Sequence, residues 1–268
     1  MFPRLLQIGH FSLATYGVLV ALALIIGLFT VVRFARREGI DPERAWSLGI
    51  VCIFAALIGA KLLLVLNEWD FYVHNPSALF SLNFLQQAGV FSGGVVAALA
   101  AGLVYGLRHR MPVFKTMDVF APGLALGHAI GRLGCFAAGC CYGKPTNLPW
   151  GVTFTSPLAQ LAGTPLGIPL HPTQIYEFLV EMFNFALLVW LFRRKKFDGQ
   201  IFGTYLFLYG IARYFLEFLR GDPDRGSVFN GLMTTTQLIS VLMVIAGGLL
   251  WMRMPRRQPE PAAPPAHA

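Results

Sequence analysis

Charged side chains are scarce in this sequence. Only 13% of its 268 residues are Asp, Glu, Lys or Arg, whereas 56% are hydrophobic; an average soluble domain carries about 25% charged residues. The mean hydropathy of +0.60 agrees with this bias. The shortage argues against an ordinary soluble domain. It predicts an all-α integral membrane protein whose membrane part, residues 1–252, forms one domain.

Cysteine is also rare, and we expect no cleavable leader. Four cysteines in a chain this large and apolar do not define a disulfide framework. The first ten residues contain one basic residue, Arg4, and no A-x-A site follows the first apolar run, so the first helix should be retained. The last segment, 253–268, is rich in Pro and Ala and lacks apolar periodicity, which predicts a disordered cytoplasmic tail.

About seven apolar stretches approach the length of about 20 residues that a helix needs to cross a bilayer. They cover residues 13–32, 46–66, 89–106, 118–134, 175–192, 200–218 and 232–252. The third and fourth are short and rich in glycine, and the chain has no internal repeat of useful strength.

Most of the 21 lysines and arginines lie in loops 33–45, 107–117 and 193–199 and in the tail, whereas loop 67–88 has none. Loops rich in Lys and Arg stay in the cytoplasm, so the N-terminus should lie outside and the C-terminus inside. The net charge of +8 is then a topology signal, and no nucleic-acid partner is expected.

Three cations, Lys61, Arg132 and Arg213, fall inside predicted spans. A Lys or Arg at mid-membrane costs about 2.5–3.5 kcal/mol on insertion scales, and such residues usually mark a site. The predicted orientation places all three at a similar depth in the outer half of the membrane. This convergence favours a shared anionic ligand such as a phospholipid headgroup; snorkelling to the outer headgroups is the alternative.

Two further groups of polar residues are expected at this depth. Tyr209, Arg213, Glu217 and Arg220 share one helical face because they are three or four residues apart, which suits either a ligand site or a structural ion-pair ladder. The stretch "HPTQIYE", 171–177, begins the fifth span, with Pro172 suited to a helix start.

The fourth span combines small and polar residues. Gly123, Gly127 and Gly131 recur every four residues, a spacing that lets helices pack closely. His128, Arg132 and Cys135 follow one another along the same helix at i, i+4 and i+7. Packing and function explain the glycines equally well.

Four blocks together resemble one family, the prolipoprotein diacylglyceryl transferases of bacterial inner membranes. The blocks are "APGLALGHAIGRLGCFAAGCCYGKPT" (121–146), "HPTQIYE" (171–177), "YGIARYFLEFLRGDPD" (209–224) and, more weakly, "GVFSGGVVA" (89–97). Their order and the surrounding spans cover nearly the whole chain, and the combination is more specific than any single block.

The resemblance implies an enzyme that transfers a diacylglyceryl group from phosphatidylglycerol to the lipobox cysteine thiol of a preprolipoprotein. A thioether forms and glycerol-1-phosphate leaves, at the outer leaflet of the inner membrane. The implied partners are phosphatidylglycerol, preprolipoprotein signal peptides and the lipid bilayer. No cofactor and no metal are expected.

The resemblance also places the family's functional residues on this chain. The signature arginine falls on Arg132, the later essential arginine on Arg213, and the signature's closing glycine on Gly143. The expected catalytic residues are Arg132, Arg213, Tyr209, Glu217 and His128, and the expected substrate-binding residues are Tyr16, Lys61, Ser92, Gly93, Gly94, Cys135, Gly143, His171, Gln174, Tyr176 and Glu177.

This chain departs from the family pattern at three positions. Cys135 stands where the family usually has Asn, Cys140 where it has Glu, and Ser92 where it has a histidine before Gly93 and Gly94. These changes fit a divergent branch with the same activity or a paralogue with a changed one.

The expected chemistry needs a thiolate and a stabilised leaving phosphate. A thiol has a pKa of about 8.5 and must ionise to be a good nucleophile, which a nearby cation favours. Guanidinium groups match phosphate oxygens, so Arg132 and Arg213 should bind the headgroup phosphate. The candidate bases are His128, Glu217 and His171 in that order, although His128 also suits ordinary helix packing.

Cys135, Cys140 and Cys141 should lie just outside the membrane, where disulfides are permitted. A disulfide from Cys135 to one of the pair is the favoured interpretation, with inert thiols, or a metal or redox site, as alternatives. The rival functions are a membrane thiol oxidoreductase or disulfide-handling paralogue that uses these cysteines, and a non-catalytic lipid-binding or transport protein.

Overall fold

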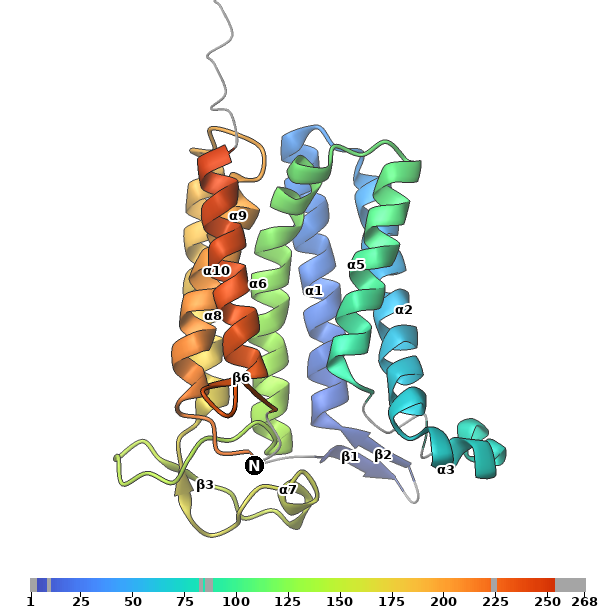
Figure 1. Ribbon diagram of the computed structural model, residues 1–268, viewed down its shortest axis with the longest axis vertical. Coiled ribbons are helices and arrows are strands. Elements are labelled where there is room, and N and C mark those ends of the chain that lie inside the picture. Colours follow the sequence, from blue (N-terminus) through green and yellow to red (C-terminus); the bar gives the residue numbers. More distant parts are fainter. Residues whose placement is uncertain (1–3, 9–10, 82–83, 85–88, 223–225, 254–268) are drawn as a thin grey trace, which may run out of the picture. The chain divides into compact units, whose positions relative to one another are not determined.

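The computed structural model describes residues 4–8, 11–81, 84, 89–222 and 226–253, and most of them are helical (Figure 1). The chain forms two compact units, unit 1 (Met1–Thr30 and Met117–Ala268) and unit 2 (Val31–Thr116). Helix α1 (Thr15–Glu38) begins in unit 1 and ends in unit 2, and α6 (Val113–Ala138) begins in unit 2 and ends in unit 1. The tail expected to be disordered lies outside the described residues, apart from Arg253.

The described residues of unit 1 form three antiparallel strand pairs and, besides its parts of α1 and α6, four helices. The pairs are β1 (Arg4–Ile8) with β2 (Phe11–Ala14), β3 (Val152–Thr153) with β4 (Pro169–Leu170), and β5 (Ser227–Val228) with β6 (Met233–Thr234). The helices are α7 (Pro157–Leu161), α8 (Thr173–Phe192), α9 (Gln200–Glu217) and α10 (Thr235–Arg253). Helix α9 packs against both α8 and α10 (Figure 1).

A buried carboxylate on α6 fixes the beginning of α9. Asp118 is fully buried, and its two carboxylate oxygens accept hydrogen bonds from the backbone N–H groups of Gly199 (2.7 Å) and Phe202 (2.8 Å). The first N–H groups of a helix have no partner within the helix, so this carboxylate acts as a cap supplied by a distant helix. Lys195 Nζ, 3.0 Å from Asp118 Oδ2, balances the buried charge.

Glycines bring α1 and α6 together within unit 1. A Cβ added to Gly27 would lie 3.0 Å from the carbonyl oxygen of Gly123, and one added to Gly127 would lie 3.2 Å from that of Ala23. Gly131, by contrast, has no neighbouring atom within 4 Å of such a Cβ. Of the three regularly spaced glycines, Gly127 therefore serves helix packing directly, and the backbone of Gly123 lies against Gly27.

Unit 2 consists mainly of α2 (Pro42–Asn67), α5 (Phe91–Arg108) and, between them, the short helix α3 (Trp69–His74) and a 3₁₀ helix, η1 (Pro76–Phe80). Pro42 and the capping residue Asp41, whose side chain accepts a hydrogen bond from Glu43 N (2.9 Å), begin α2. Helices α2 and α5 pack closely against each other.

The fold confirms an all-α membrane protein. Among the described residues, the helices α1, α2, α5, α6, α8 and α10 are long and apolar enough to cross a membrane. Helix α9, expected as another span, is an 18-residue helix that contains Arg213 and Glu217 and is not among these six. The exact count of seven and the orientation remain predictions. The β-hairpins, α3, η1 and α7 were not foreseen.

Candidate functional site

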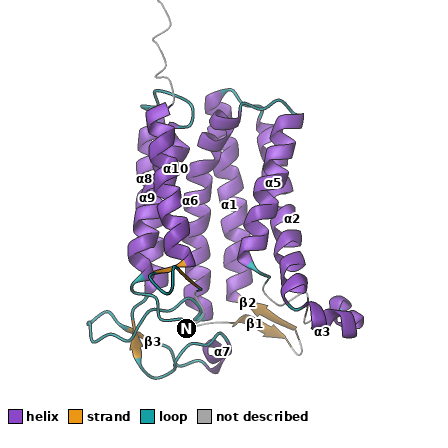
Figure 2. Ribbon diagram, in the orientation of Figure 1, coloured by secondary structure: helices purple, strands orange, loops and turns teal. Residues whose placement is uncertain are grey.

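The loop that follows α6, residues 139–146, joins the start of α8 to the end of α9. Gly143 N donates to the carbonyl oxygen of His171 (3.0 Å), and Lys144 N donates to that of Leu219 (2.8 Å). The segment containing β3 and α7 lies beyond the same end of α6 (Figure 2). Three sequence blocks far apart in the chain thus meet at one end of unit 1.

Gly143 has no room for a side chain at this junction. An added Cβ would lie 2.5 Å from His171 Cβ and 2.8 Å from the carbonyl oxygen of Leu219. Gly221 approaches from the other side, because its own added Cβ would lie 2.5 Å from the carbonyl oxygen of Gly143. The expected site glycine is therefore needed for backbone contact.

Three guanidinium groups converge on the carboxylate of Glu177, near the start of α8. Arg132 of α6 forms an ion pair with Glu177 Oε2. Arg213 of α9 approaches Glu177 Oε1 at 3.4 Å and Arg220, just after α9, at 4.0 Å. Glu177 is only 2% exposed. Such a concentration of buried charge is costly, which makes this cluster the candidate functional site.

Arg213 joins this cluster to the end of α9. Its Nη2 lies 3.0 Å from Glu217 Oε2, one turn along the helix. Glu217 Oε1 in turn accepts a hydrogen bond from Thr234 Oγ1 (2.9 Å). Arg213 Nη1 is buried and has no hydrogen-bond acceptor among the described residues. The ion pair of Nη1 with Glu177 Oε1, at 3.4 Å, thus supplies no hydrogen bond to this cationic donor.

Arg220 is fixed by a two-point contact with Asp222. Its Nε donates to Asp222 Oδ1 (2.8 Å) and its Nη2 to Asp222 Oδ2 (2.6 Å). Burial opposes the charged form, but hydrogen bonds with Asp222 and Cys141 raise the pKa of Arg220 above its ordinary value. The guanidinium therefore stays charged although it is buried.

A second polar layer lies about one turn deeper along α8. His128 Nε2 accepts a hydrogen bond from Arg132 Nε (3.1 Å), and His128 Nδ1 lies 3.8 Å from Glu181 Oε2. The ring of His128 makes an edge contact with Tyr209, with centroids 5.3 Å apart. Arg132 thus occupies the lone pair that His128 would need to act as a base.

Glu181 has its own polar partners in this layer. Its Oε1 accepts a hydrogen bond from Asn184 Nδ2 (3.0 Å), and its carboxyl group also hydrogen-bonds Tyr205. Tyr205 stacks on Tyr209, with ring centroids 5.8 Å apart. The deeper layer therefore supports the side chains that surround Arg132.

The start of α8 fixes the backbone of the cysteine pair. Gln174 Nε2 donates to the carbonyl oxygen of Cys140, and Thr173 Oγ1 donates to that of Cys141, both at 2.7 Å. Both donors are fully buried. Within the "HPTQ" stretch, Thr173 and Gln174 thus have a positioning role.

His171 and Tyr176 form a neighbouring group at the same end of unit 1. His171 Nδ1 lies 3.3 Å from the hydroxyl of Tyr176, which also accepts a hydrogen bond from Trp150 Nε1 (2.7 Å). These contacts order the segment before and at the start of α8. Their part in substrate binding remains a prediction.

The expected disulfide is absent, because all four cysteines are free. The sulfur atoms of Cys135, Cys140 and Cys141 nevertheless lie within 4.8 Å of one another. Hydrogen bonds with Cys135 and Cys140 lower the pKa of the Cys141 thiol, and Arg220 and Arg132 lower it further. The hydrogen bond with Cys135 raises the pKa of Cys140. Of these two thiols, Cys141 is therefore the one whose surroundings favour the ionised form.

Tyr16, at the start of α1, lies beside this group. It is within electrostatic reach of Arg132 and of the three cysteines. A Cβ added to Gly134 would lie 3.3 Å from Tyr16 Cδ2, so the small residue on α6 accommodates the tyrosine ring. The structure thus brings Tyr16 to the residues that the sequence grouped with it.

Four expected site residues belong to unit 2. Lys61 Nζ donates to the carbonyl oxygen of Phe84 and lies 4.6 Å from the centroid of the Phe84 ring. A Cβ added to Gly93 would lie 2.5 Å from the carbonyl oxygen of Gly59, so Gly93 serves the contact between α2 and α5. Gly94 is buried and Ser92 is exposed. A role of these residues in the site remains a prediction.

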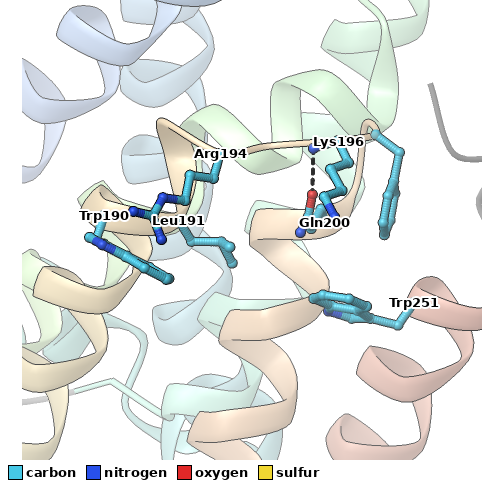
Figure 3. Close-up of a pocket in the computed structure, with 7 residues that line it drawn as sticks. Trp190, Leu191, Arg194, Lys196, Gln200 and Trp251 are labelled. Atoms are coloured by element: carbon cyan, nitrogen blue, oxygen red, sulfur yellow. Dashed lines mark hydrogen bonds between the residues drawn. The ribbon is translucent and has the colours of Figure 1, made fainter. Parts of the chain in front are cut away.

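One cavity of about 360 Å³ lies at the other end of α8 (Figure 3). It is lined by Trp190, Leu191, Arg194, Lys196, Phe197, Gln200 and Trp251, and Arg194 lies over the Trp190 ring at 4.3 Å. Trp190 is 13 residues along α8 from Glu177, or about 20 Å at 1.5 Å per residue. The described residues of the lining include neither a carboxylate nor a thiol, and the cavity is separate from the arginine cluster.

Sequence reasoning named Arg220 but did not place it in the site. Its signal was the "RGD" sequence, in which an Asp two residues later can pair with the arginine. Tyr205 was missed altogether, although it continues the four-residue spacing of Tyr209, Arg213 and Glu217. Thr234 had no comparable local signal, because the turn between α9 and α10 brings it to Glu217.

Known proteins resemble this chain over most of its length. A family model described as prolipoprotein diacylglyceryl transferase matches residues 3–253. A phosphatidylglycerol–prolipoprotein diacylglyceryl transferase of Clostridium tetani is 34% identical over 248 residues, which cover 92% of this chain and 95% of that protein. Proteins with the same name from Finegoldia magna and Synechococcus elongatus are 36% and 32% identical, covering 89% and 93% of this chain and 90% and 87% of those proteins.

Proposed function

This chain belongs to the prolipoprotein diacylglyceryl transferase family, and we propose that it transfers a diacylglyceryl group from phosphatidylglycerol to the lipobox cysteine of preprolipoproteins. The chain is a transferase, and the names of its relatives include both the lipid donor and the protein acceptor. At the level of individual residues, the proposal rests on the convergence of Arg132, Arg213 and Arg220 on Glu177.

The arginine cluster suits the headgroup phosphate. Guanidinium groups bind phosphate oxygens through two parallel hydrogen bonds. Arg213 Nη1 has no hydrogen-bond acceptor among the described residues, and Arg132 and Arg213 are brought together through Glu177. A phosphate that enters the cluster competes with Glu177 for Arg132 and Arg213. Glu177 thus keeps the cations in place before the lipid arrives.

The transfer then needs one displacement. The acceptor thiolate attacks the glycerol carbon that bears the phosphate ester. A carbon–sulfur bond forms, the carbon–oxygen bond breaks, and its electron pair leaves with glycerol-1-phosphate. Negative charge grows on this oxygen and its phosphate in the transition state, where fixed cations stabilise it most. We assign Arg132 and Arg213 to this role.

Two of the three candidate bases for the proton of the acceptor thiol already have partners in the cluster. His128 Nε2 is occupied by Arg132, and both oxygens of Glu217 are engaged by Arg213 and Thr234. Among the candidate bases, His171 lies at the loop end of the site, with Nδ1 near Tyr176. The nearby cations also favour the thiolate directly.

We place the protein in the bacterial inner membrane, with the site facing the outer leaflet. The Lys- and Arg-poor loops support this orientation, because they adjoin the helix ends that carry Arg132 and Glu177. A reporter fused to the C-terminus should be active only in the cytoplasm. Reporter activity only outside the cytoplasm would refute the orientation.

Complementation tests the function. The gene should restore growth to a bacterial strain depleted of its own transferase, and an Arg213→Ala variant should not. In parallel, purified protein should convert a lipobox peptide to a diacylglyceryl thioether in vesicles of phosphatidylglycerol, and a peptide with Ser in place of Cys should not react. Folded protein that neither complements nor forms thioether would overturn the proposal.

A further inference from the structure

Three thiols occupy one small volume next to the arginine cluster. The sulfur atoms of Cys135, Cys140 and Cys141 lie within 4.8 Å of one another, and none of the three is in a disulfide. Among the described residues, they are the one group of His, Cys, Asp or Glu side chains arranged to hold a metal ion. If two of the three cysteines formed a disulfide, the third would remain a free thiol.

The backbone adopts an unfavourable conformation to produce this arrangement. Side chains of consecutive residues in an extended chain point to opposite sides, yet both Cys140 and Cys141 reach Cys135. A φ of 83° at Gly139 and of 61° at Cys141 turns the chain. The left-handed region is uncommon for a residue other than glycine, and such outliers cluster at functional sites.

The surrounding protein holds this conformation firmly. The fully buried side chains of Gln174 and Thr173 donate hydrogen bonds of 2.7 Å to the carbonyl oxygens of Cys140 and Cys141. Cys135 is fixed separately by its place near the end of α6. The three sulfurs are therefore brought together by two independent elements, as the ligands of a preorganised site should be.

The charges around the sulfurs suit an anionic metal–thiolate group. Arg220 hydrogen-bonds Cys141, and Arg132 is within electrostatic reach of both Cys135 and Cys141. Three thiolates around a divalent cation carry one net negative charge, which these guanidinium groups would offset. Soft thiolate ligands select zinc-like cations over calcium or magnesium.

We propose that Cys135, Cys140 and Cys141 bind one zinc-class divalent cation, whose fourth coordination position takes the acceptor thiol. Tetrahedral zinc–sulfur bonds of about 2.3 Å place sulfurs about 3.8 Å apart, so the observed group needs only a small contraction. Three protein ligands and one open position are typical of catalytic zinc. Among the described residues, no fourth His, Cys, Asp or Glu joins the group.

This site extends the proposed function, on which the acceptor role depends. A thiol that binds the cation loses its proton to solvent, so no protein base is needed. The bound sulfur attacks the glycerol carbon, the carbon–oxygen bond breaks, and its electron pair leaves on glycerol-1-phosphate beside Arg132 and Arg213. The cation does not change its oxidation state. The thioether product carries no thiolate charge and is a weaker ligand, so it can leave.

Metal binding is tested first on the purified, reduced, chelator-stripped full chain. Titration with Cd²⁺ should produce a thiolate-to-metal charge-transfer absorption that saturates at one ion per chain, and Zn²⁺ should remove it by competition. Cys141→Ser and Cys135→Ser should each weaken binding at least about tenfold, a loss typical of a disturbed metal site. Cys52→Ser is the matched control, because Cys52 lies on α2 outside the group and should leave binding unchanged.

Each other result counts against the site. Absence of the absorption in the wild-type protein would overturn the proposal without the need for any variant. Equal binding by folded Cys141→Ser, or loss of binding in Cys52→Ser, would also overturn it. Stable formation of a disulfide among the three cysteines in place of metal binding under reducing conditions would do the same.

The open position is tested with the acceptor. A lipobox peptide added to the Cd²⁺-loaded protein should increase the charge-transfer absorption, because a fourth thiolate joins; the Ser-containing peptide should not. Removal of the metal should lower transfer at least about tenfold, and Zn²⁺ should restore it. Full transfer by the stripped protein would refute the acceptor role and leave the proposed function intact. A site that binds Cd²⁺ and the peptide thiol in a protein that never transfers lipid would refute the function alone.

Discussion

The two units are built from similar apolar helices but bury different side chains. Among the described residues, every buried charged side chain belongs to unit 1: Asp118, Glu177, Glu181, Arg213, Glu217 and Arg220. The only buried polar or charged residue of unit 2 in that part of the chain is Thr116. Unit 2 instead relies on close contact between glycine-containing faces of α2 and α5.

This difference distinguishes the side chains that pack the helices from those that form the candidate site. Buried ion pairs contribute little net stability and can destabilise a fold relative to apolar packing. Unit 2 forms an apolar helix pair without them, so a membrane helix pair of this chain does not require buried charge. The charges of unit 1 are therefore best explained by a ligand that needs them, whereas the Asp118 group secures the beginning of α9.

The largest effect should come from removing the arginines of unit 1. Arg132→Ala and Arg213→Ala should each lower transfer by about 10²–10³-fold or more, because each removes a cation from the developing phosphate charge. Lysine at either position should restore little activity, since a point charge lacks the two-point contact. The measurement is thioether formation per folded protein in phosphatidylglycerol vesicles.

Lys61→Ala is the corresponding change in unit 2. Its loss should be smaller, because Lys61 is already held by the carbonyl oxygen of Phe84. A loss as large as that of the arginine variants would show that the functional site includes unit 2. Near-normal transfer by well-expressed Arg132→Ala or Arg213→Ala would instead refute the proposal that these arginines bind the headgroup phosphate.

Charge removal should also affect stability differently in the two units. Asp118→Ala should reduce the free energy of unfolding by about 1–3 kcal/mol, because the backbone N–H groups of Gly199 and Phe202 lose their acceptor, while Lys195 keeps Asp198 at 2.9 Å. Arg44→Ala removes an exposed pair with Asp41 (3.4 Å) and should cost about 1 kcal/mol or less. The unfolding temperatures of the two variants are measured in the same detergent. Equal decreases would contradict the expected difference between the two units.

Crowded glycines should separate function from packing. Gly143→Ala forces a Cβ within 2.5 Å of His171, and Gly59→Ala forces one within 2.5 Å of the carbonyl oxygen of Gly93. Each overlap should cost about 1–3 kcal/mol. Only Gly143→Ala should also lower transfer per folded protein, because it displaces the loop beside the cysteines. Equal specific activity of the two variants would count against the site at that loop.

The smallest effect is expected at two glycines that have open space. A Cβ added to Gly131 in unit 1 or to Gly106 in unit 2 meets no atom within 4 Å. Alanine at either position should stabilise the protein by about 0.4–1 kcal/mol and leave transfer unchanged. A large loss for Gly131→Ala alone would mean that a ligand uses this space.

The helices could be predicted from the sequence because apolar length is a local property. Each of the seven predicted ranges coincides with a helix to within six residues at either end, for example 175–192 with α8. The β1–β2 hairpin was missed, because residues 4–14 have no turn signal strong enough to stand out from an apolar run. Local patterns thus fix the long helices better than the segments between them.

The arginines of the cluster could be singled out from the sequence, but their shared contact with Glu177 could not. Arg132 and Arg213 stood out as charges in apolar surroundings, yet nothing local indicated that both would meet Glu177. A disulfide from Cys135 to one of the pair was the favoured interpretation because the cysteines were expected to lie just outside the membrane. Their actual arrangement depends on the φ of Cys141 and on hydrogen bonds from Thr173 and Gln174, which are tertiary features.

The junction of loop 139–146 with α8 and α9 also sets the order of assembly during synthesis. A nascent chain emerges from its N-terminus, so α6 and Arg132 enter the membrane before Glu177 exists to neutralise the arginine. The loop cannot complete its backbone hydrogen bonds until Leu219 has been made, because the carbonyl oxygen of Leu219 accepts a hydrogen bond from Lys144 N. The site can therefore close only after α9 has been made, and a ribosome that stalls before that point leaves a partly inserted chain with no working centre.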